Sequence, residues 1–176
     1  GRVCHIALSQ ASSRPSIRMV KFGVAYEDEA PPNLAAFPFV AVCCDNQLPL
    51  DAAFAKLVEG DELTAARQAL ETAFWEHLNQ AISQNPLSKD LRNLVAPHLQ
   101  ADHLLSCPAL QQMDFFRASD GQFYSLQQLE LWEHHHVCLD DSVETPLQQL
   151  CLRPDANMAR LLKAYFGSRY CDKTNE

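Results

Sequence analysis

The chain has 176 residues, of which 47% are hydrophobic and 20% charged, a composition that predicts a globular fold and excludes collagen-like and largely disordered proteins. Its net charge is −8, and no run of Lys or Arg forms the basic stripe that a phosphate backbone requires, so we expect no nucleic-acid binding. The longest apolar stretch, residues 35–44, is interrupted by Pro38 and is too short to cross a bilayer. We therefore expect no membrane span.

The cysteines favour a reducing compartment. The chain contains 7 of them, an odd number, and its opening residues lack the basic segment and apolar run of a secretory signal peptide. A disulfide framework is therefore not expected. We expect free thiols and a cytosolic protein.

Three strands are predicted near the N-terminus, at Val3–Leu8, residues 17–26 and residues 37–44. In the second, Val20, Phe22, Val24 and Tyr26 alternate with Lys21, Gly23 and Ala25. This period of two is typical of a strand with one buried face.

A long amphipathic helix is predicted from Asp61, which is a suitable N-cap, to Asn85-Pro86. Its apolar residues recur every three or four positions and share one stripe: Leu63, Ala66, Leu70, Phe74, Leu78 and Ile82. Residues 88–105 predict one or two shorter helices, broken before Pro97. We place a domain boundary near Ser106.

A smaller module is predicted after this boundary. It starts with a short apolar segment from Cys107 and a Ser119-Asp120-Gly121 turn. A helix over residues 125–135, a loop and a last helix after Pro154 follow. The predicted fold class is therefore α+β, with an N-terminal α+β domain over residues 1–105 and a small C-terminal module over residues 106–176.

Several short motifs of this module occur in an order and spacing typical of one family. They are Cys107-Pro108-Ala109, Ser119-Asp120-Gly121, Tyr124, Leu129, Trp132, Thr145-Pro146, Pro154-Asp155, Met158, Arg160, Leu161 and Leu162. Together they resemble a U-box, the zinc-free relative of the RING domain of ubiquitin ligases. The resemblance covers about a third of the chain, and the expected core comprises Tyr124, Leu129, Leu150, Met158 and Leu161.

This resemblance implies a ubiquitin ligase (E3) that promotes direct transfer of ubiquitin from a conjugating enzyme (E2) to a substrate lysine. The residues that would bind E2 are Ala109, Leu110, Trp132, Pro146 and Leu147. Such a ligase supplies neither nucleophile, cofactor nor metal, and it positions the E2-bound ubiquitin. The implied role of residues 1–105 is to bind the substrate.

The sequence departs from the family pattern in four respects. The segment before the Ser119-Asp120-Gly121 turn and the second loop are short, and Ala109 stands where members commonly carry Ile. At the second-loop position where many members use Arg or Lys to hold the ubiquitin thioester closed, the nearest residues are Gln148 and Gln149. These departures predict a weaker affinity for E2 and a lower activity.

The plan of the chain, one box and no familiar repeat or coiled coil, is similar to that of single-box virulence effectors that bacteria secrete into the host cell cytoplasm. A eukaryotic cytosolic ligase is the alternative source. A different class of function is a non-catalytic interaction protein with a degenerate U-box fold, which would bind a partner without transfer activity.

Two other chemistries compete with this interpretation. Zinc would need two closely spaced ligand pairs, and among His98, His103, Cys107, His134, His135, His136 and Cys138 no such pair of pairs appears. His134 and Cys138, four residues apart, would make half a site. Alternatively, Cys138 beside His135 and His136 would serve as the nucleophile of a thioester-forming transferase. Asp140 and Asp141 oppose this because nearby carboxylates raise a thiol pKa.

Overall fold

The computed structural model describes residues 1–9, 14–85, 88–132, 135–137 and 151–172. It contains both helices and strands, so the predicted α+β class is confirmed. The chain divides into two compact units, Gly1–Leu78 and Asn79–Glu176, and each is described by itself.

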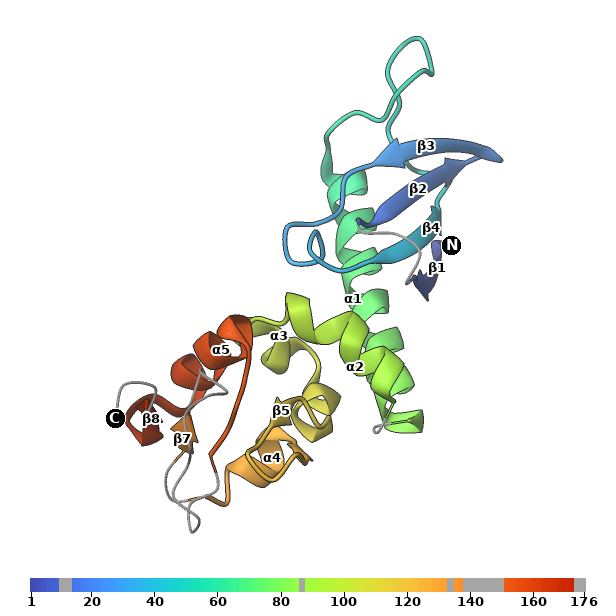
Figure 1. Ribbon diagram of the computed structural model, residues 1–176. Coiled ribbons are helices and arrows are strands. Elements are labelled where there is room, and N and C mark those ends of the chain that lie inside the picture. The colour runs from blue at the N-terminus through green and yellow to red at the C-terminus, as the bar shows by residue number, and fades with distance from the viewer. Residues whose placement is uncertain (10–13, 86–87, 133–134, 138–150, 173–176) are drawn as a thin grey trace. The chain divides into compact units, whose positions relative to one another are not determined.

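The first unit contains a mixed sheet. Within the described part of this unit, it is formed by β1 (Val3–Leu8), β2 (Ser16–Lys21), β3 (Val24–Asp28) and β4 (Phe39–Cys44), in the order β1-β4-β2-β3 (Figure 1). Strand β4 runs antiparallel to β1 and parallel to β2. β1 thus has the predicted bounds and lies at an edge of the sheet.

The single strand predicted over residues 17–26 is wrong, because the chain reverses there and forms the β2–β3 hairpin. Lys21 pairs with Val24, and the two residues between them, Phe22 and Gly23, have φ angles of 49° and 83°. Two positive φ angles are typical of a tight hairpin turn, and glycine adopts them readily. The period of two continued through the turn and concealed it.

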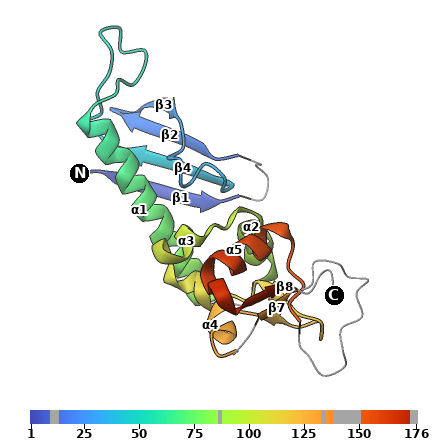
Figure 2. The same cartoon turned by 90° about the vertical axis from the view of Figure 1, so that its left-hand side faces the viewer.

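Helix α1 (Asp61–Gln84) begins and ends close to the predicted residues, and its N-terminal part lies along one face of the sheet (Figure 2). Asp61 is the first helical residue, and the Gly60 carbonyl oxygen accepts the N–H of Thr64 at 3.0 Å. Phe74 is fully buried, with ring centroids 5.4 Å from Phe37 and 5.0 Å from Phe39. These aromatic rings join the helix to the sheet.

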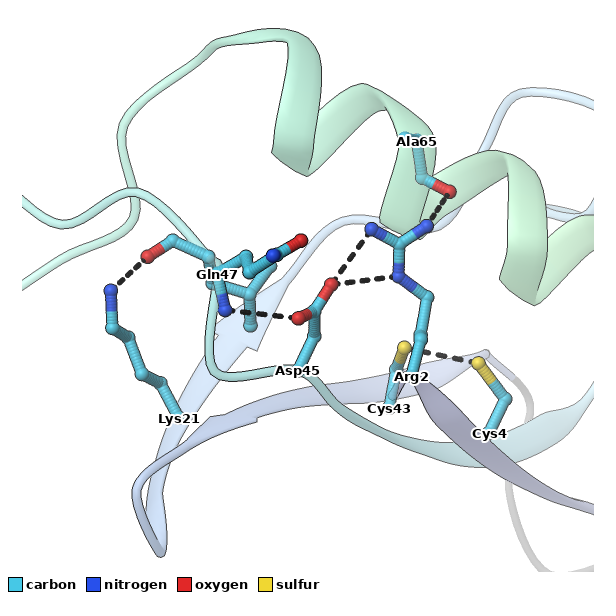
Figure 3. Close-up of polar contacts among 8 residues, drawn as sticks. Arg2, Cys4, Lys21, Cys43, Asp45, Gln47 and Ala65 are labelled. Atoms are coloured by element: carbon cyan, nitrogen blue, oxygen red, sulfur yellow. Dashed lines mark hydrogen bonds and ion pairs between the residues drawn. The ribbon is translucent and has the colours of Figure 1, made fainter.

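An ion pair fixes the start of β1 to the end of β4 and to α1. The Arg2 Nε donates to Asp45 Oδ2 at 2.8 Å, and its Nη1 donates to the Ala65 carbonyl oxygen at 2.7 Å (Figure 3). The Gln47 N–H donates to the other Asp45 oxygen at 2.9 Å. Burial raises the pKa of Asp45, but the Gln47 N–H and the Arg2 guanidinium outweigh it and hold this pKa below its usual range.

The second unit begins with the last turns of α1 and continues through short helices. They are α2 (Lys89–Val95), the 3₁₀ helix η1 (Ala96–His98), α3 (Ala101–Ser106) and the 3₁₀ helix η2 (Pro108–Gln112). The α-helical geometry ends at Val95, one residue before Ala96-Pro97, as the proline predicts. The unit ends with α5 (Ala156–Phe166) and η3 (Gly167–Arg169), after which β8 (Tyr170–Asp172) pairs in parallel with β7 (His135–Val137).

The division between the units falls after Leu78, whereas the boundary predicted near Ser106 lies inside the second unit. The reason is that α2 and η1 pack with the C-terminal elements. The Asn157 amide donates to the carbonyl oxygens of Ala96, Pro97 and Leu99 at 3.3, 3.3 and 3.2 Å. The Arg92 guanidinium also lies 3.9 Å from the ring centroid of Phe123.

Candidate partner-binding site

A short hairpin forms the frame of the candidate site. Strands β5 (Phe116–Arg117) and β6 (Phe123–Tyr124) are antiparallel, and the predicted Ser119-Asp120-Gly121 turn joins them. Gly121 has a φ of 80°, and its N–H donates to the Ala118 carbonyl oxygen at 3.0 Å. The Asp120 carboxylate accepts the Gln122 N–H at 2.9 Å and the Tyr124 hydroxyl at 2.7 Å, which fixes the turn to β6.

Residues 151–153 lie beside this hairpin as a third extended segment. The Ser119 N–H donates to the Cys151 carbonyl oxygen at 2.8 Å, and the Cys151 N–H donates to the Ser119 hydroxyl oxygen at 3.2 Å. Ala118 and Leu152 form an antiparallel bridge, and the Arg153 N–H donates to the Arg117 carbonyl oxygen at 2.7 Å. Two segments far apart in the sequence are thus held together by hydrogen bonds.

Helix α4 (Leu126–Leu129) follows the hairpin directly. Ser125 and Gln128 form a capping box, in which the Ser125 Oγ accepts the Gln128 N–H at 3.2 Å and the Gln128 Oε1 accepts the Ser125 N–H at 2.8 Å. Leu126 and Leu129 are fully buried and fix the helix on the core. The helix predicted over residues 125–135 is therefore only one turn long.

An exposed apolar residue follows this turn. Leu131 is 87% exposed. The Arg169 Nη1 donates to the backbone carbonyls on both sides of it, at 3.2 Å for Glu130 and 3.4 Å for Trp132. The Tyr165 hydroxyl also donates to the Glu130 carboxylate at 2.8 Å. We call Leu131 and Trp132 together the Leu131 surface. These hydrogen bonds fix the backbone that presents the Leu131 side chain to solvent.

Trp132, one of the predicted E2-binding residues, is half-buried at this surface. Its ring packs edge-on against Tyr124, with 5.2 Å between the ring centroids. The hydrogen bond with Asp120 raises the pKa of Tyr124, so this hydroxyl stays protonated and continues to donate at neutral pH. The hairpin thus supports the ring that flanks Leu131.

Ala109 and Leu110, also predicted to bind E2, lie in η2 and are only 4% and 0% exposed. The Ala109 N–H donates to Asn79 Oδ1 at 3.2 Å, which holds η2 against the end of α1. These side chains face the core and offer no surface to a partner. The sequence resemblance, which covers residues within 106–176, did not predict the role of Asn79. The hydrogen bond between Asn79 and Ala109 joins residues that are 30 positions apart.

The other predicted site residues, Pro146, Leu147, Gln148, Gln149 and Cys138, lie outside the described residues. Of the predicted core of the module, Leu129, Met158 and Leu161 are buried and Tyr124 is half-buried, whereas Leu150 is not described. Leu131, two residues after Leu129, lies outside this core and is exposed. Its position five residues after Leu126 turns it away from the buried side of the helix.

The histidines and cysteines of the described ranges do not gather as metal ligands would. Within those ranges, no three His, Cys, Asp or Glu side chains form such a group. The His103 Nδ1 accepts the Gln100 N–H at 3.1 Å and caps α3. Burial raises the pKa of the Cys107 thiol and lowers the pKa of His98, so both groups are kept neutral.

A hollow of about 610 Å³ lies between α2, the hairpin and the start of α5. Four cationic side chains line it: Lys89, Arg92, Arg117 and Arg153. Among the described residues of its lining, the one carboxylate is Asp155, which accepts the Met158 N–H at 2.8 Å as the cap of α5. The charge of this lining favours an anionic group.

No helix in the described part of the chain has both the length and the hydropathy needed to cross a membrane. In comparison with known proteins, the chain matches no protein-family model and has no significant match among curated proteins.

Proposed function

We propose that the C-terminal unit is a U-box-like module of a ubiquitin ligase, which recruits a charged E2 and promotes transfer of ubiquitin to a substrate lysine. The observation that carries this proposal is the order of its parts. A hairpin with a Ser-Asp-Gly turn, a short helix, a third extended segment and a closing helix follow one another, with residues 151–153 bonded to residues 117–119. Of the motifs that resemble a U-box, Ser119-Asp120-Gly121 lies in the hairpin, Leu129 in α4 and Met158 in α5, whereas Thr145-Pro146 lies outside the described residues.

Hydrogen bonds in the hairpin also support a zinc-free module. Asp120 binds Gln122 and Tyr124, and Ser119 binds Cys151 through both its backbone and its hydroxyl. These hydrogen bonds join the turn to β6 and to the third segment. A RING domain would fix equivalent loops with zinc ligands.

The proposed mechanism is positional. Leu131 and Trp132 dock on an apolar surface of E2, and the bound E2 then holds its ubiquitin thioester in one orientation. The substrate amine attacks the thioester carbonyl carbon, an isopeptide bond forms, and the E2 cysteine leaves as a thiolate. The ligase lowers the entropic cost of this encounter and forms no bond to ubiquitin.

The first unit, Gly1–Leu78, is proposed to hold the substrate. In an effector secreted by a bacterium, this substrate would be a host protein. Val24 and Phe54 are 54% and 72% exposed in this part and offer apolar contacts for a protein partner.

A second candidate is a binding module without transfer activity. The burial of Ala109 and Leu110 favours it, because the first loop of the resemblance then contributes no apolar anchor for E2. In this case the Leu131 surface still binds a partner protein, and no ubiquitin is transferred.

An autoubiquitination assay with a panel of E2 enzymes distinguishes these candidates. Chains that form with the wild type and with Cys138→Ala, and that are lost with Trp132→Ala and Pro146→Ala, support the U-box mechanism. Loss of chains in Cys138→Ala, together with a reducible ubiquitin adduct on the wild type, would instead indicate that the Cys138 thiol is the nucleophile. If no E2 in the panel gives chains, the ligase proposal is wrong.

A further inference from the structure

Two free thiols face each other across the edge of the sheet in the first unit. Cys4 in β1 is directly opposite Cys43 in β4 in the antiparallel register. The two sulfur atoms are 3.0 Å apart, with the Cys4 thiol donating to Cys43 (Figure 3). Opposed residues of antiparallel strands have Cα atoms about 4.5–5.5 Å apart, which lies within the range that a disulfide bridges.

The strand pattern places both side chains on the same face. Cys4, Ile6 and Leu8 are the more buried residues of β1. In β4, Cys43 is likewise one of the buried residues that alternate with more exposed ones. The adjacent Cys44 is half-buried, follows Cys43 by one position and is opposite Val3. Because successive strand residues point to opposite faces, Cys44 faces away from Cys4.

The two thiols differ in access. Cys4 is half-buried, whereas Cys43 is fully buried. Burial, followed by the contact with Cys4, raises the pKa of Cys43 to about 12. Cys4 is therefore the thiol that a dissolved reagent meets first, and Cys43 is the neighbour that can attack it afterwards.

We propose that Cys4 and Cys43 are a disulfide-forming pair that is oxidised by a glutathione-type disulfide. The Cys4 thiolate attacks one sulfur of oxidised glutathione, the S–S bond breaks, and one glutathione thiolate leaves. The Cys43 thiol then loses its proton and attacks the Cys4 sulfur of the mixed disulfide, which releases the second glutathione. The two protein thiols lose two electrons, and oxidised glutathione gains them as it becomes two reduced molecules.

The bond ties an edge strand to its neighbour. β1 pairs only with β4 among the described strands of its sheet, so a Cys4–Cys43 bond holds β1 in place when its hydrogen bonds open. The Arg2–Asp45 ion pair lies on the same two segments and keeps their register (Figure 3). This inference concerns the first unit and does not depend on the proposed ligase function.

The test uses the whole chain in buffers of oxidised and reduced glutathione, followed by acid quenching, alkylation with N-ethylmaleimide and non-reducing peptide mapping. Trypsin releases Cys4 in the peptide 3–18, because it does not cut between Arg14 and Pro15, and releases Cys43 and Cys44 in the peptide 22–56. The variants are Cys4→Ser, Cys43→Ser and the matched control Cys44→Ser, with circular dichroism to verify folding.

We expect the linked peptides 3–18 and 22–56 in the wild type and in Cys44→Ser, and their absence in Cys4→Ser and Cys43→Ser. Denaturing the wild type in urea should lower the yield at least ~10-fold, because the fold supplies the high local concentration of the two thiols. The proposal is overturned if the folded wild type retains both thiols, if Cys43→Ser still yields the link, or if urea leaves the yield unchanged. Because Cys4 is half-buried, Cys4→Ser provides a variant that keeps its fold if Cys43→Ser does not.

Discussion

Truncating Leu131 to Ala should weaken the docking of E2 without affecting folding. Burying a Leu side chain contributes about 1.5–3 kcal/mol. Since Leu131 is 87% exposed in the free protein, almost all of this contribution remains to be gained on docking. Allowing for the methyl group that Ala keeps, we expect a loss of about 1–2.5 kcal/mol, which is a roughly 5- to 60-fold weaker affinity.

This prediction is checked by calorimetric titration of the wild type and of Leu131→Ala with an E2 that gives ubiquitin chains. The free energy of unfolding, measured by thermal denaturation, should differ between the wild type and Leu131→Ala by no more than about 0.5 kcal/mol, because an exposed side chain contributes little to folding. The matched control is Val24→Ala, an apolar residue that is 54% exposed on β3 and should leave the affinity unchanged. An unchanged affinity of Leu131→Ala would refute the assignment of the Leu131 surface to E2.

Three further predictions concern stability. Phe74→Ala should lower the free energy of unfolding by about 3–5 kcal/mol, because the ring is fully buried between Phe37 and Phe39. Urea denaturation measures this loss, and a loss below about 1 kcal/mol would contradict the proposed core. Ser125→Ala should lower the free energy of unfolding by about 0.5–2 kcal/mol, because it removes the cap of α4. The control, Gln127→Ala at an exposed neighbour, should leave stability nearly unchanged. Equal shifts of the melting temperature in the two variants would refute the role of the cap. The folded-state pKa of Asp45 is depressed, so its carboxylate stabilises the fold. This contribution to the free energy of unfolding is complete above the unfolded pKa of ~3.9 and is lost as the pH falls through the folded pKa. Asp45→Asn should therefore lose less stability than the wild type between pH ~5 and ~2 in urea titrations, and equal losses would contradict the role of this carboxylate.

The sequence predicted the elements whose signals are local. β1 and the start of α1 depend on residue periodicity, and the turn at Gly121 depends on a glycine with positive φ. The β2–β3 hairpin was missed although Gly23 signalled it, because a two-residue turn does not interrupt alternation. The length of α4 was overestimated because its end depends on contacts with Tyr165 and Arg169, far along the chain.

The candidate site was less accessible to sequence reasoning. A motif gives the order of Ala109 and Leu110 but not the direction in which they face. Here the Ala109 N–H donates a hydrogen bond to Asn79, which holds their helix against the core. The two units divide after Leu78, and not near Ser106, for a similar reason: Asn157 binds carbonyls of residues before Ser106. The Cys4–Cys43 juxtaposition depends on strand register, which residue types alone do not specify.

The measurement that tests the central claim most directly is single-turnover discharge of ubiquitin from a preloaded E2 to free lysine. Using free lysine removes the unknown substrate, so the readout reports only activation of the E2-bound thioester. The account predicts faster discharge with the wild type and with Cys138→Ala, and slower discharge with Leu131→Ala and Trp132→Ala. Discharge at the rate of E2 alone, across a panel of E2 enzymes, would contradict the ligase function.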